Sequence, residues 1–203
     1  MSLRPLENTR IDFAEKSDAD LMAEVADGDH ASFTELMARY KTPLFRFILR
    51  YVGARSEAED LLQDVFISVF SKAASYDPAW KPTTWIYRIA LNKCRDYGRK
   101  QRLRKFVSIT RPDNEDEPGS YTPEPVDLGP NVEDIVARRQ EISRLSAAID
   151  ALPHKMRSAL VLHTIEGRSQ IECSEILGVS RKSVEMLVYR ARKTLRDKLG
   201  YQP

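Results

Sequence analysis

The chain of 203 residues has few of the groups from which disulfides, metal sites and membrane segments are built. No apolar run approaches the roughly 18 residues that a membrane helix needs. The N-terminal segment MSLRPLENTRIDFAEKSD has no apolar core of the kind found in secretory signals. We therefore expect a cytoplasmic protein that does not insert into a membrane.

The two cysteines, Cys94 and Cys173, stand far apart, and neither belongs to a Cys-x-x-Cys pair. The three histidines, His30, His154 and His163, are equally isolated. We expect no disulfide, metal or cofactor, and we interpret both cysteines as small buried groups. Because the sequence also lacks Gly-x-Ser-x-Gly, a P-loop and His-Glu-x-x-His, it predicts neither an enzyme nor a small-molecule substrate.

The alternation typical of strands is missing as well, whereas apolar residues recur with the period of a helix. Leu21, Met22 and Val25 begin the first apolar stripe, and the glycines and prolines cluster between periodic segments. The run from Ser56 to Glu59 predicts a capping box before a helix that reaches about Phe70. The fold class is therefore predicted to be all-α. Further helices are expected at 44–52, 84–105, 135–152, 154–166, 169–177 and 181–199.

An acidic, proline-rich segment separates two helical parts. Residues 112–134 hold eight Asp and Glu side chains, no Lys or Arg, and five of the eleven prolines. Such a segment buries too little apolar surface to offset the entropy lost on ordering, which predicts an extended linker. We expect a flexible tail at 1–17, a first domain at 18–105, an acidic linker at 106–134 and a second domain at 135–203. The domains are expected to share no core and to be loosely arranged in the free protein.

The second domain carries a helix-turn-helix pattern. A short helix at 169–177 is followed by Gly178-Val179-Ser180 and by a longer helix at 181–199. Residues 181–198 hold seven basic and two acidic side chains. A recognition helix turns its first residues toward base edges in the major groove, while other basic residues contact phosphates. A solvated basic helix in an unrelated bundle is the alternative. The apolar stripe leaves these residues exposed: Arg181, Lys182, Glu185, Met186 and Tyr189.

A second basic segment follows a group of aromatic residues. Residues 86–106 hold eight basic side chains and one acid, Asp96, and Trp80, Trp85 and Tyr87 lie at or before the start of this segment. Single-stranded nucleic acid needs basic groups that neutralise its backbone and aromatic faces on which its bases stack. The segment therefore predicts a surface for single-stranded nucleic acid. A place in the core is an alternative for Trp85.

One helix, at residues 57–70, is acidic on its polar side. This acidic ridge would repel nucleic acid, which favours a protein partner with basic side chains. A solvated helix face explains the same residues equally well. The ridge consists of Glu57, Glu59, Asp60, Gln63 and Asp64.

The order of three segments carries a family resemblance. AEDLLQDVF is followed by TTWIYRIALNKCRDYGRK and, after the linker, by LPHKMRSALVLHTIEGRSQIECSEILGVSRKSVEMLVYRARKTL. Over about 18–105 and 140–199, this order resembles the extracytoplasmic-function sigma factors of bacterial RNA polymerase. The resemblance implies a region-two domain at 18–105 and a region-four domain at 135–203. It also implies a protein that binds polymerase core, directs it to promoter DNA, opens the minus-ten region and is held inactive by an anti-sigma factor.

The resemblance assigns roles to particular residues. Those implied to bind polymerase core are Asp60, Gln63, Asp64 and Phe66. Those implied to bind unpaired minus-ten DNA are Tyr76, Trp80, Arg88, Asn92, Arg95, Asp96, Arg99 and Lys100. Those implied to bind duplex minus-thirty-five DNA are Ser180, Arg181, Lys182, Ser183, Glu185, Met186 and Arg190. The linker is expected to lie in a basic channel of the polymerase.

The chain departs from the family pattern at three places. Cys173-Ser174 stands where Ile-Ala is usual, Ile171 where a polar residue is common, and 183–186 reads Ser-Val-Glu-Met instead of Thr-Val-Lys-Ser. The promoter sequence that the chain recognises is therefore not predicted. A standalone helix-turn-helix regulator would explain 169–199 but not the acidic ridge, and an all-helical enzyme would need catalytic groups that the sequence does not offer.

Overall fold

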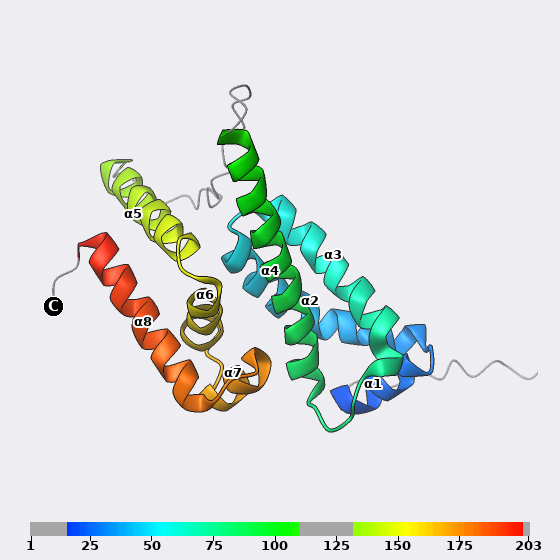
Figure 1. Cartoon of the computed structure of the whole chain (residues 1–203). Helices are drawn as coiled ribbons and strands as arrows, with labels where there is room; N and C mark the ends of the chain where they lie inside the picture. The colour runs from blue at the N-terminus through cyan, green and yellow to red at the C-terminus, as the bar shows by residue number, and fades with distance from the viewer. Residues whose placement is uncertain (1–15, 110–131, 201–203) are drawn as a thin grey trace, which may run out of the picture.

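The computed structural model describes residues 16–109 and 132–200, and within these ranges every regular element is a helix. The predicted all-α class is confirmed. No helix in the described part is both long and apolar enough to span a membrane. The α-helices are α1 (Asp18–Ala26), α2 (His30–Val52), α3 (Arg55–Lys72), α4 (Pro82–Ile109), α5 (Val132–Asp150), α6 (His154–Leu160), α7 (Gln170–Leu177) and α8 (Arg181–Leu199) (Figure 1).

The first half of the chain, α1 to α4, forms a bundle whose helix ends follow from local chemistry. Ser17 caps α1, because its hydroxyl accepts the Asp20 amide while the Asp20 carboxylate accepts the Ser17 amide. The side chain of Asp29 caps α2 in the same sense by accepting the Ser32 amide at 2.8 Å. Gly53 ends α2 with a φ of +85°, a left-handed conformation that glycine adopts without strain.

The predicted capping box at the start of α3 is wrong. Ser56 lies inside the first turn, where its hydroxyl donates to the Glu57 carboxylate, and the N-cap is Ala54, which has no capping side chain. The turn from Gly53 starts the helix two residues earlier than the capping pattern suggests. The apolar side of α3 is buried as expected, through Leu61, Leu62, Val65, Phe66 and Val69.

The second half contains the predicted helix-turn-helix. Ser169 and Glu172 form a capping box at the start of α7, and Gly178 ends α7 with a φ of +66°. Ser180 then caps α8, because its hydroxyl accepts the Ser183 amide at 3.2 Å. A five-residue π-helix, Val161–Ile165, continues α6 toward α7. The helix boundaries predicted for 169–177 and 181–199 are confirmed within one residue.

The expectation that the two halves share no core is wrong. Buried residues of the first half, such as Phe47 and Tyr87, belong to one apolar cluster with Leu162, Ile176 and Val188 of the second half. The long helix α4 packs against α7 of the second half and has α3 on its opposite side (Figure 1). The composition of the linker predicts the behaviour of that segment alone. It does not predict whether the apolar surfaces of the two halves pack against each other.

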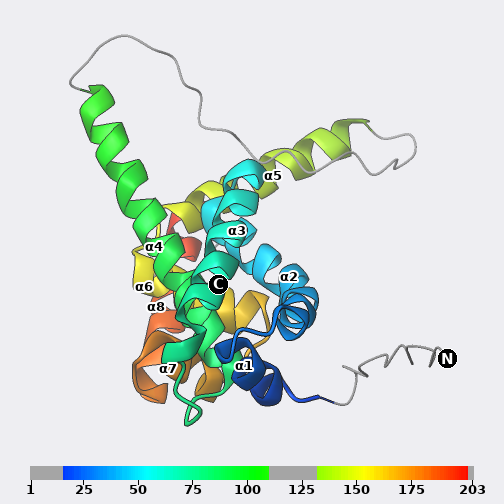
Figure 2. The same cartoon turned by 90° about the vertical axis from the view of Figure 1, so that its right-hand side faces the viewer.

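The linker boundaries also shift. The structure describes 106–109 as the end of α4 and 132–134 as the start of α5, so both helices are longer than predicted. These two helix ends extend away from the rest of the molecule (Figure 2). The remainder of the predicted linker, 110–131, and nearly all of the predicted tail lie outside the described residues.

Candidate nucleic-acid and polymerase interfaces

The helix α8 presents one buried and one exposed side. Val184, Val188 and Ala191 are buried against the rest of the second half. On the other side Met186 is exposed, and Tyr189 keeps 57% of its surface accessible. The structure therefore places every residue predicted for duplex DNA on the exposed surface of α8 or at its N-cap. These residues are Ser180, Arg181, Lys182, Ser183, Glu185, Met186 and Arg190.

Tyr189 belongs to this exposed surface although the minus-thirty-five assignment leaves it out. Lys182, Met186, Tyr189 and Lys193 follow one another at intervals of four, three and four residues, so they form one stripe along α8. The spacing in the sequence already contains this signal. Ile171, at the start of α7, is a second exposed apolar side chain in the same motif.

The loop before α4 is ordered by its own contacts. The Trp80 amide donates to the Asp77 carbonyl at 3.0 Å, and the Tyr76 hydroxyl donates to the Trp80 carbonyl. Tyr76 also packs edge-on against Trp85, with ring centroids 5.4 Å apart. Trp85 is half-buried against the core, which supports the core alternative for that residue, whereas Trp80 is 39% exposed.

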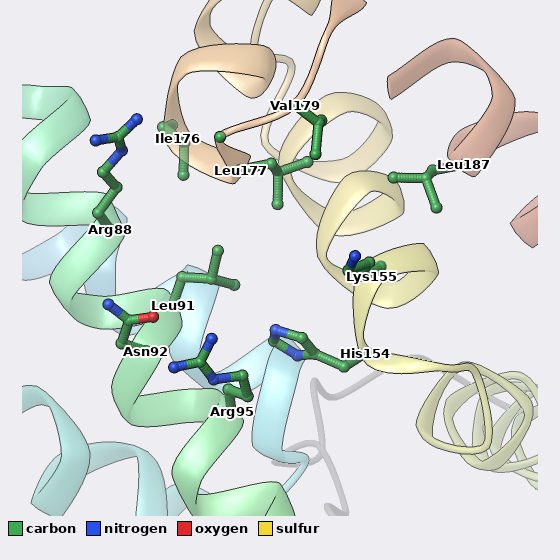
Figure 3. Close-up of a pocket in the computed structure, with 11 residues that line it drawn as sticks. Arg88, Leu91, Asn92, Arg95, His154, Lys155, Ile176, Leu177, Val179 and Leu187 are labelled. Atoms are coloured by element: carbon green, nitrogen blue, oxygen red, sulfur yellow. The ribbon is translucent and has the colours of Figure 1, made fainter. Parts of the chain in front are cut away.

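Three of the residues predicted for minus-ten DNA lie on one side of α4. Arg88, Asn92 and Arg95 are spaced by four and three residues and line a groove of about 500 Å³ between the two halves (Figure 3). The opposite wall of the groove comes from the second half, through His154, Lys155, Ile176, Leu177, Gly178, Val179 and Leu187.

Arg88 contacts both the loop before α4 and the second half of the chain. Its guanidinium lies over the Trp80 ring, 4.1 Å from the centroid. The same group donates from Nε and Nη2 to the Glu175 carbonyl, at 2.9 and 2.7 Å. Glu175 is in the last turn of α7, so Arg88 satisfies a carbonyl that has no partner within the helix and meets the negative end of the helix dipole.

Trp80 joins this group through Arg88, whereas Asp96, Arg99 and Lys100 do not line the groove. The Asp96 carboxylate lies 3.4 Å from Arg99 and 4.0 Å from Arg95, which makes it an anchor for its basic neighbours. Arg99 and Lys100 are exposed further along α4. The predicted minus-ten set is therefore divided among the loop before α4, the groove and the exposed part of α4 beyond it.

Comparison with known proteins shows the family to which the chain belongs. The family description "Sigma-70 region 2" matches residues 36–104, and "Sigma-70, region 4" matches residues 142–195. RNA polymerase sigma factor CnrH of Cupriavidus metallidurans is 33% identical over 89% of this chain and 93% of its own length. The chain belongs to the sigma-70 family of RNA polymerase sigma factors. The predicted resemblance is confirmed.

Other relatives agree with this assignment. The extracytoplasmic-function (ECF) RNA polymerase sigma factor SigW of Bacillus subtilis is 31% identical over 87% of this chain and 93% of its own length. The structure of CnrH in complex with the cytosolic domain of CnrY matches 91% of this sigma factor and 98% of that chain, with a TM-score of 0.63 and 26% identity. The sigma factor RpoE of Bartonella quintana, in complex with the anti-sigma factor NepR, has the same fold, with a TM-score of 0.60, 19% identity, and 84% of this chain and 98% of that chain covered.

The acidic ridge of this sigma factor is only partly as predicted. Asp60 and Gln63 are exposed, and the Asp64 carboxylate lies 3.6 Å from the Lys93 ammonium of α4. Phe66, predicted to bind polymerase core, is buried in the core of the bundle with 9% of its surface exposed. The next residue, Ile67, is 65% exposed.

Both cysteines are buried, as the sequence predicts. Burial raises the pKa of the Cys94 thiol to about 12 and that of the Cys173 thiol to about 11. Both thiols are therefore protonated at neutral pH, and they act as small apolar groups in the core of this sigma factor.

Proposed function

We propose that this sigma factor acts by binding alone, on RNA polymerase in the cytoplasm, and that it recognises promoters through two separate surfaces. As a sigma factor it binds the polymerase core and directs promoter-specific initiation. The observation that carries the proposal is the division of α8 into a buried apolar side and an exposed basic side that begins at the capped Ser180.

We assign the exposed side of α8 to the duplex minus-thirty-five element. Arg181 and Lys182 lie in the first turn, where side chains of a recognition helix reach base edges. Met186 offers an apolar contact of the kind that thymine methyl groups provide. Arg190, one turn beyond Met186, suits a phosphate, which fixes the position of the helix without reading the sequence.

We assign the loop at 76–81 and the adjoining side of α4 to the unpaired minus-ten strand. Trp80 is exposed and held in place by the loop, so its ring is ready to stack on a base, which contributes about 1–3 kcal/mol. Arg88, Asn92 and Arg95 follow on the same helix and supply charge and hydrogen-bond donors. Capture of an extruded base by such a surface offsets the few kcal/mol that its unstacking costs.

We assign the outer side of α3 to the polymerase core. Asp60, Gln63 and Ile67 combine exposed acid, amide and apolar groups on one helix, and nucleic acid would be repelled by the acids. The acidic linker is expected to contribute through a basic channel of the polymerase. An anti-sigma factor, as NepR is for the Bartonella protein, is expected to hold the chain inactive.

The experiment that tests the proposal combines the chain with purified core polymerase and DNA selected from a random pool. We expect promoter-specific transcripts only when both proteins are present, and co-purification of the two. A standalone helix-turn-helix regulator would instead select duplex DNA without polymerase and would not co-purify with core.

A further inference from the structure

A series of hydrogen-bonded side chains joins α1 and α2 to the start of α4. Tyr40 of α2 is buried, and its hydroxyl donates to the Asp18 carboxylate at the start of α1. The same hydroxyl lies 2.6 Å from the Thr83 hydroxyl, in the first turn of α4. Arg39 completes the series, since its guanidinium lies 2.8 Å from the Asp18 carboxylate. Side chains from three helices therefore meet next to the end of the loop at 76–81.

The hydroxyl protons in this series have one arrangement. A carboxylate only accepts hydrogen bonds, so the single proton of the Tyr40 hydroxyl is directed at Asp18. The Thr83 hydroxyl must then donate to the Tyr40 oxygen. Burial, followed by the hydrogen bond to Asp18, raises the pKa of Tyr40, so its proton stays on the phenol at neutral pH. The three side chains are therefore joined in a fixed direction.

The loop at 76–81 is attached to α1 on both of its sides. Before the loop, the short 3-10 helix η2 (Ala73–Ser75) packs on α1, and Ala73 is buried. After the loop, Thr83 is joined to α1 through Tyr40 and Asp18. Two views show α1 beside the loop and the first turn of α4 (Figure 1 and Figure 2). The second attachment includes hydroxyl groups, which conservative substitutions can remove without changing the shape of the side chains.

Trp80 lies between these two attachments. Its amide donates to the Asp77 carbonyl, and its carbonyl accepts the Tyr76 hydroxyl. These contacts are internal to the loop, so they determine its shape. The direction in which the loop enters α4 is determined at 81–83, where the Trp85 amide donates to the Lys81 carbonyl and the Thr83 hydroxyl is held by Tyr40.

We infer, on the basis of the minus-ten role proposed for the loop, that Tyr40 is a positioning residue for single-strand binding. Through Thr83 it fixes the direction of the loop, and with it the Trp80 ring on which an unpaired base stacks. Tyr40 acts without touching DNA, because it is buried. An ordered ring loses less entropy on stacking than a mobile one, so loss of the hydroxyl contacts weakens binding.

Substitutions that keep the side-chain shape provide the test. Tyr40→Phe deletes the phenol hydroxyl, Thr83→Val deletes the alcohol, and Thr83→Ser keeps it. Tyr97→Phe is the matched control, because Tyr97, further along α4, accepts a hydrogen bond from Gln101 at 2.8 Å. Circular dichroism and co-purification with core polymerase check that each variant keeps its fold and its partner.

The first measurement is the fluorescence anisotropy of Trp80 in the free chain. The sequence has two tryptophans, so Trp85→Phe leaves Trp80 as the only emitter. In this background, anisotropy should fall and acrylamide quenching should rise in Tyr40→Phe and in Thr83→Val. Because the two residues share one hydrogen bond, the double variant should match the single ones. Thr83→Ser and Tyr97→Phe should match the parent.

The second measurement is the affinity of the complex with core polymerase for a fluorescent single-stranded oligonucleotide, selected from a random pool by the wild-type complex. Tyr40→Phe and Thr83→Val should each weaken this affinity about fivefold, the size of effect that one hydrogen bond produces. Thr83→Ser and Tyr97→Phe should leave it unchanged, and affinity for core polymerase should stay the same throughout. Trp80→Ala tests the minus-ten role of the loop independently.

The outcomes separate the positioning role from the minus-ten role. Unchanged anisotropy in Tyr40→Phe overturns the positioning role and leaves the minus-ten role intact. Lower anisotropy with unchanged oligonucleotide affinity also overturns it when Trp80→Ala weakens binding. Unchanged affinity in Trp80→Ala overturns the minus-ten role of the loop, and the inference with it. Parallel losses in Tyr40→Phe and Thr83→Val, with wild-type behaviour in Thr83→Ser, support the inference.

Discussion

The guanidinium carbon of Arg168 lies 4.0 Å from the centroid of the Tyr87 ring, and the two residues come from opposite halves of the chain. The Tyr87 side chain is fully buried, so the cation and the ring meet with little water between them. Burial raises the pKa of Tyr87, which keeps its hydroxyl neutral. A contact of this kind stabilises a folded protein more strongly than one on the surface.

We predict that Arg168→Ala lowers the free energy of unfolding by about 2 kcal/mol, because the cation–π contact and the packing of the Arg stem are both lost. Urea unfolding followed by circular dichroism measures the change. Arg192→Ala serves as the control, since Arg192 is exposed on α8, where it donates to the Thr164 hydroxyl at 3.3 Å. Equal effects of the two substitutions would show that the Tyr87 contact contributes nothing of its own.

Acid should loosen the interface at His154. Burial, followed by the charges of Arg157 and Lys155, lowers the pKa of His154, whose ring contacts the Tyr51 hydroxyl of α2. Arg95 of α4 lines the same groove and adds a further positive charge. Because the pKa is lower in the folded protein than in the unfolded chain, the unfolded state binds more protons once the pH falls below about 6.5, and stability decreases toward acid.

We therefore predict that the free energy of unfolding of the wild type falls between pH 7.5 and pH 5.5 by more than that of His154→Asn. Asparagine keeps an acceptor for the Tyr51 hydroxyl but does not titrate. Urea midpoints at several pH values give the comparison. Parallel curves for the two proteins would mean that other groups cause the pH dependence.

If α8 recognises bases of the minus-thirty-five element, substitutions at its start should weaken binding only to promoters that contain this element. Arg181→Ala and Lys182→Ala should each weaken binding of the polymerase complex by about 1–3 kcal/mol on promoters with the minus-thirty-five element. Lys198→Ala, near the end of the same helix, is the control for a general loss of positive charge. Equal losses on promoters that lack the element would identify Arg181 and Lys182 as phosphate contacts.

The α3 surface predicts opposite consequences for two neighbouring residues. Ile67→Asp should reduce affinity for core polymerase about tenfold or more with little change in stability, because Ile67 is largely exposed. Phe66→Ala should instead lower the free energy of unfolding by about 3–5 kcal/mol, since a buried aromatic ring is lost. Competition for core and urea unfolding separate the two effects.

The acidic group of the same surface is tested by Asp64→Arg, which should weaken core binding while the fold is kept. The substitution also breaks the contact of Asp64 with Lys93, so Lys93→Ala is needed as a control for that ion pair. Unchanged core affinity in Asp64→Arg would leave the acidic ridge as a solvated helix face.

Local patterns predicted most of the helices, because capping and periodicity depend on neighbours in the chain. Ser180 and Gly178 illustrate this, since each determines a helix end through its own side chain or backbone. The burial of Phe66 could not be predicted in the same way. The apolar face of α3 is wide, and whether a residue at the edge of that face is buried depends on the helices that pack against it. Ile67, one residue on, is on the other side of that border.

The contact between the two halves could not be predicted from the sequence, for a different reason. Arg88 is one of eight basic residues in its segment, and nothing local distinguishes the one that donates to a carbonyl in α7. Its partner is a backbone oxygen, which every residue possesses. Hydrogen bonds of this kind leave no trace in residue types, so interfaces built on them are found only when the chain is folded.

The packing of α7 on α4 has a thermodynamic consequence for any ligand of the covered side of α4. A ligand that needs this side binds only chains in which the contact is broken, so its apparent affinity falls with the fraction of such chains. If packed chains outnumber separated ones by about 100 to 1, the affinity falls about a hundredfold, which is about 2.7 kcal/mol. A ligand of α3 alone leaves this ratio unchanged, because α3 lies on the far side of α4 from α7 (Figure 1).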